Sequence, residues 1–238
     1  MSTIIKSGYA LDASSSSMVE IADFIRFLDE PLKHVRIDIR ALQSRLDMRD
    51  SLRTIHHHCS QLEDLRLTIN YQGTGEDGSW FDLSPILLCS RLKRLWIKHP
   101  RVLPIVDDDV FTMLSSWEDI QELSLNPEPT NYRGEKPELT VLSLVYVAQM
   151  GPKLHDVGLC IDLGAALPET TSHSWSSLSN IHLGLSTHDG QAGVDLLQVA
   201  EFINDIFPAA QVSTSRIDVH HLELEERLEL VRSSATGA

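Results

Sequence analysis

The chain has 238 residues, of which 42% are hydrophobic, enough for a domain with a substantial buried core. Its formal charge of −14 at pH 7 disfavours binding to nucleic acid or to an anionic membrane surface. Three cysteines are too few for a disulfide-stabilised secreted domain. Met1 to Ala10 lacks the apolar core of a secretory signal, and no apolar run reaches the ~18 residues of a membrane helix. We therefore expect a protein of the cytoplasm or nucleus.

The first predicted elements are a flexible lead-in and a helix. Residues 1–17 are expected to form the lead-in, which ends in the serine run Ser14 to Ser17. Ser17 is the expected N-cap of the helix, and Glu20 stands three residues later, where it would complete a capping box. The apolar positions that follow have the spacing of one helical stripe, and they are Ile21, Phe24, Ile25 and Leu28.

One pattern then recurs six times: Leu or Ile, two mostly polar residues, an aliphatic residue, any residue, and another aliphatic residue. The copies begin at Leu32, Leu62, Leu92, Ile120, Leu154 and Leu178, so successive starts lie 24 to 34 residues apart. Within each copy the aliphatic residues alternate with a period of two, which is typical of a strand with one buried face. Strands are therefore predicted near residues 35–39, 65–69, 95–98, 123–126, 157–161 and 181–185.

Helical patterns separate several of these strands. The acidic run Asp107 to Asp109 suits a helix N-terminus, and Pro137 suits the first turn of another helix. The apolar stripe of residues 194–207 predicts a further helix, which Pro208 ends. Residues 71–79 and 126–136 are predicted insertion loops, residues 222–231 a cap or a partner-binding element, and residues 233–238 a flexible tail.

Strand–helix repetition with a period of ~30 residues fits two architectures. In a doubly wound α/β domain both sheet faces are buried, and the strands read as continuous apolar runs. Most of the strands here alternate instead. We therefore predict an α/β leucine-rich-repeat solenoid, or horseshoe, over residues 18–232, with a parallel sheet on its concave face and helices on its convex face. A nucleotide-dependent α/β enzyme is the less favoured alternative.

The repeats resemble the leucine-rich-repeat region of fungal F-box proteins over about residues 18–220. Two helix-to-strand joints carry the resemblance, Ile55-His-His-His-Cys-Ser-Gln-Leu62 and Tyr146-Val-Ala-Gln-Met-Gly-Pro-Lys-Leu154, together with the terminal block from Val199 to Pro208. The resemblance implies a substrate receptor of a cullin-RING ubiquitin ligase, in which the repeats select the protein to be ubiquitinated. A separate F-box segment would bind the adaptor subunit of the ligase.

The N-terminal residues depart from this family pattern. An F-box is a Leu-Pro-led helical segment, and residues 1–17 are too short to contain one. Two interpretations stay open. Either the F-box lies upstream of this chain, or the chain is a stand-alone repeat scaffold or regulator with no ligase link.

The outward positions of the predicted strands identify a candidate binding surface. Equivalent residues of neighbouring strands lie ~4.8 Å apart on a concave sheet face. The candidate partner-binding residues are Arg36, Asp38, Arg66, Thr68, Trp96, Lys98, Asn126 and His182. Arginine and tryptophan dominate interface hot spots, so this surface predicts binding of an acidic or phosphorylated segment of another protein. The alternative is a set of solvated strand residues that pair with Asp38 or other neighbours.

Other motifs give weaker indications of a cofactor or metal site. Residues 73–78 match the G-x-G-x-x-G fingerprint, but Glu76 and Asp77 would repel a pyrophosphate, so an insertion loop is expected and no cofactor. The run His56 to His58 beside Cys59 would point in several directions from a helix end, so we expect no metal site there, nor at His220-His221.

The cysteines and the missing motifs complete the sequence-based predictions. Cys59 and Cys89 stand at equivalent places in neighbouring repeats, where we expect buried thiols, with a disulfide as the alternative. The sequence contains no G-x-S-x-G, P-loop or H-E-x-x-H motif, so no catalytic residues are predicted and the protein is expected not to be an enzyme.

Overall fold

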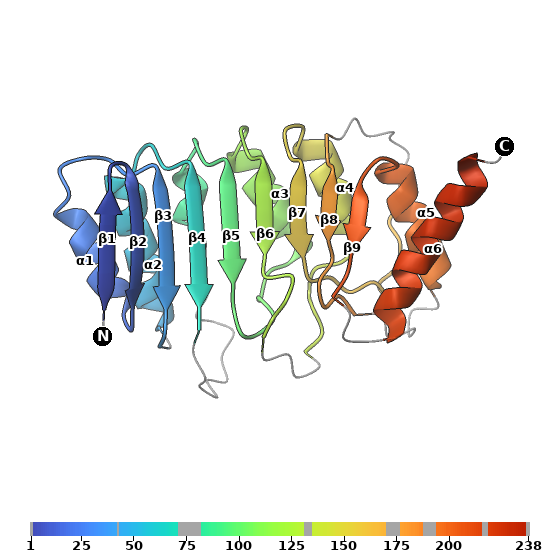
Figure 1. Cartoon of the computed structure of the whole chain (residues 1–238), viewed down its shortest axis with the longest axis horizontal. Helices are drawn as coiled ribbons and strands as arrows, with labels where there is room; N and C mark the ends of the chain where they lie inside the picture. Colours follow the sequence, from blue (N-terminus) through green and yellow to red (C-terminus); the bar gives the residue numbers. More distant parts are fainter. Residues whose placement is uncertain are drawn as a thin grey trace.

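The computed structural model describes residues 2–41, 43–70, 82–130, 135–169, 177–187, 194–215 and 219–236. Within these ranges the chain forms a mixed α/β fold around a nine-stranded sheet, and the strands follow one another across the sheet in sequence order (Figure 1). The strands are β1 (Thr3–Ser7), β2 (Ala10–Ser15), β3 (His34–Ile39), β4 (Asp64–Ile69), β5 (Arg94–Lys98), β6 (Glu122–Leu125), β7 (Asp156–Leu159), β8 (Asn180–His182) and β9 (Gln211–Ser213). Strands β1 and β2 are antiparallel, and all the later pairs are parallel.

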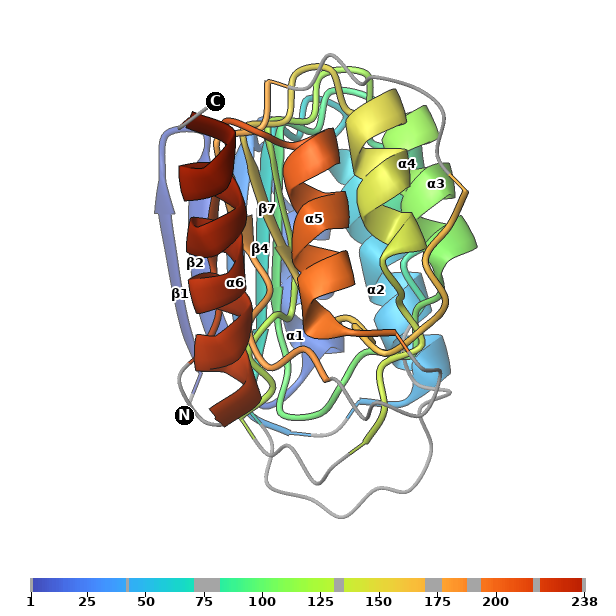
Figure 2. The same ribbon diagram turned by 90° about the vertical axis from the view of Figure 1, so that its right-hand side faces the viewer.

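All the helices except the last lie on one side of this sheet. The helices are α1 (Met18–Arg26), α2 (Arg45–His58), the short 3-10 helix η2 (Ile86–Leu88), α3 (Asp107–Ser116), α4 (Leu142–Met150), α5 (Leu196–Ile206) and α6 (Val219–Thr236). Helices α1 to α5 cover one face, whereas α6 stands beside β9 at the end of the sheet (Figure 2). In the described part of the chain, the opposite face carries no helix. We call it the open face.

The alternation within each repeat explains why one sheet face is buried. Equivalent aliphatic residues stand in register on neighbouring strands and are at most 3% exposed: Val35, Leu65, Leu95, Leu123, Val157 and Ile181. A second ladder lies two residues farther along each strand, on the same face, and contains Ile37, Leu67, Ile97 and Leu125. These ladders pack against the helical layer, and the residues between them are left on the open face.

The N-terminal residues correct the prediction of a flexible lead-in. Residues 3–15 form the β1–β2 hairpin, and β2 pairs in parallel with β3 and buries Leu11 and Ala13. The predicted capping box is also wrong, because Ser17 makes no side-chain cap bond. Glu20 accepts hydrogen bonds from the hydroxyls of Ser2 (2.8 Å) and Ser15 instead.

Several boundaries differ from the sequence-based prediction. Strands β7 and β8 end at Leu159 and His182, where the predicted strands end at residues 161 and 185. Helix α4 begins at Leu142, so Pro137 precedes it instead of standing in its first turn. Helix α6 continues to Thr236, so residues 233–236 are helical where a flexible tail was expected. The predicted loop 71–79 lies outside the described residues, as do residues 131–134 of the loop 126–136. No helix in the described ranges has the length and apolarity needed to cross a membrane.

Candidate functional site

Four of the predicted residues stand in one row across the open face, which we call the middle row: Arg36, Arg66, Trp96 and His182. Across β3 to β8 it runs Arg36, Arg66, Trp96, Ser124, Gly158 and His182, and it extends to Asp12 on β2 and Ser213 on β9. Trp96 is 39% exposed, which is high for an aromatic residue in the centre of a sheet. An exposed tryptophan among polar neighbours marks this row as the first candidate for an interaction surface.

The predicted residues that lie two positions farther along the strands form a second row, which covers only three strands. Asp38, Thr68 and Lys98 stand in register on β3, β4 and β5. Asn126 does not continue the row, because β6 ends at Leu125 and Asn126 turns inward with φ of 53°. Its Oδ1 accepts a hydrogen bond from the backbone N of His99 (2.8 Å), and its Nδ2 donates one to the carbonyl of Arg101 (2.7 Å). Asn126 is only 1% exposed, so the prediction that it stands outward on the sheet face is wrong, although it still contributes to the lining of the groove described below.

A third row of the open face, two residues before the middle row, contains a functional candidate that the sequence analysis missed. Arg94 lies here, beside Asp64 on β4. The Asp64 carboxylate accepts a hydrogen bond from Nε of Arg66 (3.3 Å) and another from Nε of Arg94 (2.9 Å). No described residue occupies the terminal nitrogens of either guanidinium. Asp64 therefore orients two arginines whose free ends remain available for an anion. The period-two pattern places Arg94, two residues before Trp96, on the same face as Trp96.

The open face is hollowed between β5 and β8. The groove has a volume of about 540 Å³, and Trp96 and His182 stand on either side of it. The middle row between them contributes only Ser124 and Gly158, whose small size leaves the space. Arg66 and Arg94 also line the groove, so the arginine pair and the hollow form one continuous site.

The segment after β6 closes one end of the groove. The carbonyl of Pro127 accepts a hydrogen bond from the backbone N of Leu185 (2.8 Å). A Cβ at Gly158 would lie 3.2 Å from the ring of Pro127, and a Cβ at Gly184 would lie 1.8 Å from its carbonyl oxygen. Glycine at both positions therefore lets the segment cross β7 and β8. We call residues 126–128 the strap.

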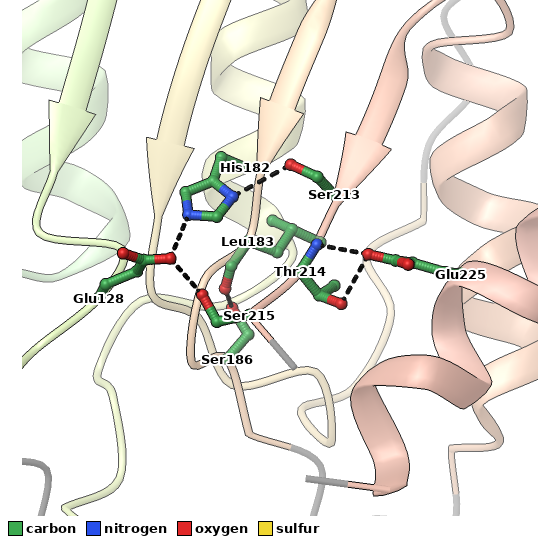
Figure 3. A network of polar contacts seen from close by, with 8 residues as sticks. All are labelled: Glu128, His182, Leu183, Ser186, Ser213, Thr214, Ser215 and Glu225. Carbon is green, nitrogen blue, oxygen red and sulfur yellow. Dashed lines mark hydrogen bonds and ion pairs between the residues drawn. The ribbon is translucent and has the colours of Figure 1, made fainter. Parts of the chain in front are cut away.

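Glu128 fastens the strap to β8 and to the residues after β9 (Figure 3). Its Oε1 lies 3.1 Å from Nε2 of His182 and accepts a hydrogen bond from the hydroxyl of Ser215. The hydrogen bond from Ser215 and then the nearby His182 and Lys98 keep the pKa of Glu128 below its ordinary value. Nδ1 of His182 lies 3.0 Å from Oγ of Ser213, so this histidine is held from both sides. His182 is therefore a fixed wall of the groove.

The charges of the open face are more mixed than a cationic patch. Asp12 faces Arg36 in register, and Asp38 lies 3.8 Å from Nε of Arg40. No described residue forms an ion pair with Arg36 or with Lys98. Carboxylates gather farther along, because Glu122 and Asp156 line the groove in register with each other. From β3 to β5 the Arg and Lys side chains of this face are thus accompanied by Asp38 and Asp64, whereas β6 and β7 carry Glu122 and Asp156 with no Lys or Arg.

The remaining sequence candidates lie away from this groove. Cys59, Cys89 and Cys160 are free and buried, and burial raises the pKa of Cys59 to about 11 and that of the other two to about 12. Such thiols are protonated and inert near neutral pH. The run His56 to His58 ends α2, and no group of three or more metal-ligating side chains is found among the described residues. The G-x-G-x-x-G loop and the side chains of His220 and His221 lie outside what the structure describes.

Comparison with known proteins adds no family. The chain matches no protein-family model, and no curated protein matches it significantly. The geometry of the open face is therefore the basis for the function proposed below.

Proposed function

We propose that this chain is a leucine-rich-repeat solenoid whose open sheet face binds an extended segment of another protein. The solenoid assignment is supported by the sequential strand order, the uniform register of the aliphatic ladders and the helices on one face. The binding role is supported above all by the exposed Trp96, which borders a groove of about 540 Å³ on a face that no described helix covers.

The arginines indicate an acidic or phosphorylated residue in the bound segment. Arg66 and Arg94 present their terminal nitrogens around one shared carboxylate, and Arg36 follows on the next strand. Guanidinium groups bind carboxylates and phosphates in a bidentate manner. A side chain of this kind would lie beside the indole of Trp96, which supplies the apolar contact area.

Affinity capture with a matched pair of variants tests this proposal. The open-face variant combines Arg36→Ala, Arg66→Ala and Trp96→Ala. The control combines Arg26→Ala, Arg53→Ala and Phe27→Ala, which removes the same classes of side chain from exposed positions of α1, its C-cap and α2. A protein that the native chain and the control capture, and that the open-face variant loses, supports the proposal. Equal capture by all three chains contradicts it.

The resemblance to F-box proteins extends the proposal to a biological context, in which the captured protein is the substrate of a cullin-RING ubiquitin ligase. The full gene product would then co-precipitate with the adaptor subunit of that ligase, and the captured protein would accumulate when the open-face variant replaces the native protein. Partner capture without the adaptor favours the alternative, a stand-alone repeat scaffold or regulator.

A further inference from the structure

The half of the groove beyond Trp96 differs chemically from the arginine half. Between Trp96 and His182 the middle row carries only the small Ser124 and Gly158, so a slot lies over β6 and β7. The indole forms one side of this slot, His182 the other, and Pro127 of the strap closes its end. Three sides are thus set by residues of the described chain.

Two carboxylates stand side by side at the other end of the slot. Glu122 and Asp156 are paired in register on neighbouring strands, and both line the groove. Asp156 receives a hydrogen bond from the side-chain amide of Asn180 and lies against Nδ1 of His155. No described residue donates a hydrogen bond to the Glu122 carboxylate. Like charges at directly opposed positions destabilise a sheet, and a cation placed between them would relieve the repulsion.

The nearest fixed cation does not serve this purpose. Arg94 stands beside Glu122 in register, but among the described residues its ion pair is with Asp64 on the opposite side and none joins it to Glu122. Its terminal nitrogens are those that we assign to the acidic residue of the bound segment. Lys98 lies at the strap end of the groove, where it contributes to lowering the pKa of Glu128. Among the described residues Glu122 has no counter-ion, and Asp156 has only its neighbour His155, which is charged only when protonated. Both carboxylates line the same groove as the indole of Trp96, an aromatic group of the kind that attracts cations.

We propose that this slot receives a lysine or arginine side chain of the bound protein segment. The proposal rests on the proposed function, and it adds a charge order to the segment: an acidic or phosphorylated residue over Arg66 and Arg94, and a basic residue over Glu122 and Asp156. The slot centre lies between β6 and β7, about two and a half strand spacings, or roughly 12 Å, from β4. An extended segment spans this distance in about three to four residues.

A selection from a display library of random dodecapeptides tests the charge order. The immobilised native chain is the bait, and the variant Arg36→Ala/Arg66→Ala/Trp96→Ala is used to discard peptides that bind elsewhere. We expect the enriched peptides to carry Lys or Arg about three to four residues from an acidic residue. One enriched peptide is then synthesised with its basic residue and with norleucine in its place.

Binding of both peptides to two chains completes the test. On the native chain, norleucine should weaken binding about tenfold, as expected for loss of a charge-assisted contact next to an indole. On the isosteric variant Glu122→Gln/Asp156→Asn the two peptides should bind equally. The matched control Asp23→Asn/Asp50→Asn, on the exposed faces of α1 and α2, should keep the tenfold difference.

The possible outcomes separate the two proposals. Peptides that need Trp96 but show no basic preference, or a norleucine effect that persists in Glu122→Gln/Asp156→Asn, overturn the slot assignment and leave the proposed function standing. A selection in which no peptide remains after the open-face variant has removed its binders counts against both proposals.

Discussion

At the residue scale, the left-handed Asn126 shows how a polar side chain becomes structural. It bonds the backbone at His99 and Arg101 and so fixes the point where the chain leaves β6 and enters the strap. Asn126→Ala removes both hydrogen bonds from a buried site and adds the strain of a positive φ. We expect it to lower the free energy of unfolding by about 2–4 kcal/mol in urea denaturation.

Asn126→Gly separates the two causes, because it loses the same hydrogen bonds but accepts the positive φ. The glycine variant should therefore be about 1 kcal/mol more stable than the alanine variant. Equal stability of the two variants would show that strain contributes nothing at this position.

His99, which Asn126 contacts, gives a prediction on pH dependence. The side chain is fully buried, and burial lowers its pKa from 6.5 to about 4. Between these values the unfolded chain binds a proton that the folded chain does not, so the stability due to neutral His99 is present above pH 6.5 and is lost as the pH falls towards 4. The loss would reach as much as ~3 kcal/mol.

Denaturation at several pH values between 4 and 7 measures this effect. His99→Gln should flatten the dependence of unfolding free energy on pH in that range. His57→Gln, at an exposed position near the end of α2, should leave it unchanged. A wild-type slope that persists in His99→Gln contradicts the assignment.

At the element scale, the strap depends on Gly158 and Gly184, which the sequence pattern does not distinguish from other glycines such as Gly8. Gly184 has φ of 48°, and an added Cβ would overlap the Pro127 carbonyl. Gly8 has nearly the same φ, 55°, with nothing within 4 Å of an added Cβ. Gly8→Ala should therefore cost only the conformational strain of about 1–2 kcal/mol.

Gly184→Ala should cost clearly more, because the strap must move as well, and it should also release Pro127 and Glu128 from β8. Urea denaturation measures the difference between the two alanine variants, and limited proteolysis reports cleavage within the strap. Equal costs for the two substitutions would mean that the strap is not held against Gly184.

Helix α6 provides a second prediction for an element. Oε1 of Glu225 accepts hydrogen bonds from the backbone N (2.8 Å) and the hydroxyl (2.9 Å) of Thr214, directly after β9 (Figure 3). Leu224 and Leu228 of the same helix are buried. Glu225→Ala should speed amide hydrogen exchange in α6 and β9 by at least about tenfold, the equivalent of 1.4 kcal/mol. Glu226→Ala, at an exposed position of the same helix, should leave exchange unchanged.

Some elements are predicted well from the sequence and others are not. The difference arises because some depend on residues close together in the sequence, whereas others depend on contacts between residues far apart in the sequence. Strands β3 to β8 are predicted by the alternation of aliphatic residues along each repeat. The same alternation predicts that Arg36, Arg66 and Trp96 lie on one face of the sheet, in register with one another. The inward turn of Asn126 depends on His99, a buried partner 27 residues away. Likewise the β1–β2 hairpin is too short to show a clear pattern, and its order comes from pairing with β3.

At the scale of the whole molecule, every strand pairs only with its neighbours in sequence. Interactions between strands are therefore local in the chain, and each end of the sheet is held by a single strand pair. In such an architecture the ends open more readily than the centre. The outer edge of β1 has no strand partner among the described residues, so β1 should open first.

Native-state hydrogen exchange measures this gradient. We expect the highest protection in β4 to β6, and protection that declines towards β1 and β9. Leu95→Ala, at a fully buried position of β5, should cost about 2–5 kcal/mol and reduce the protection of β4 to β6 together, because Leu95 stands in register with Leu65 and Leu123. If all nine strands instead exchange with one common free energy, the sheet unfolds as a single unit, and the open face where we place the binding groove has no weaker end.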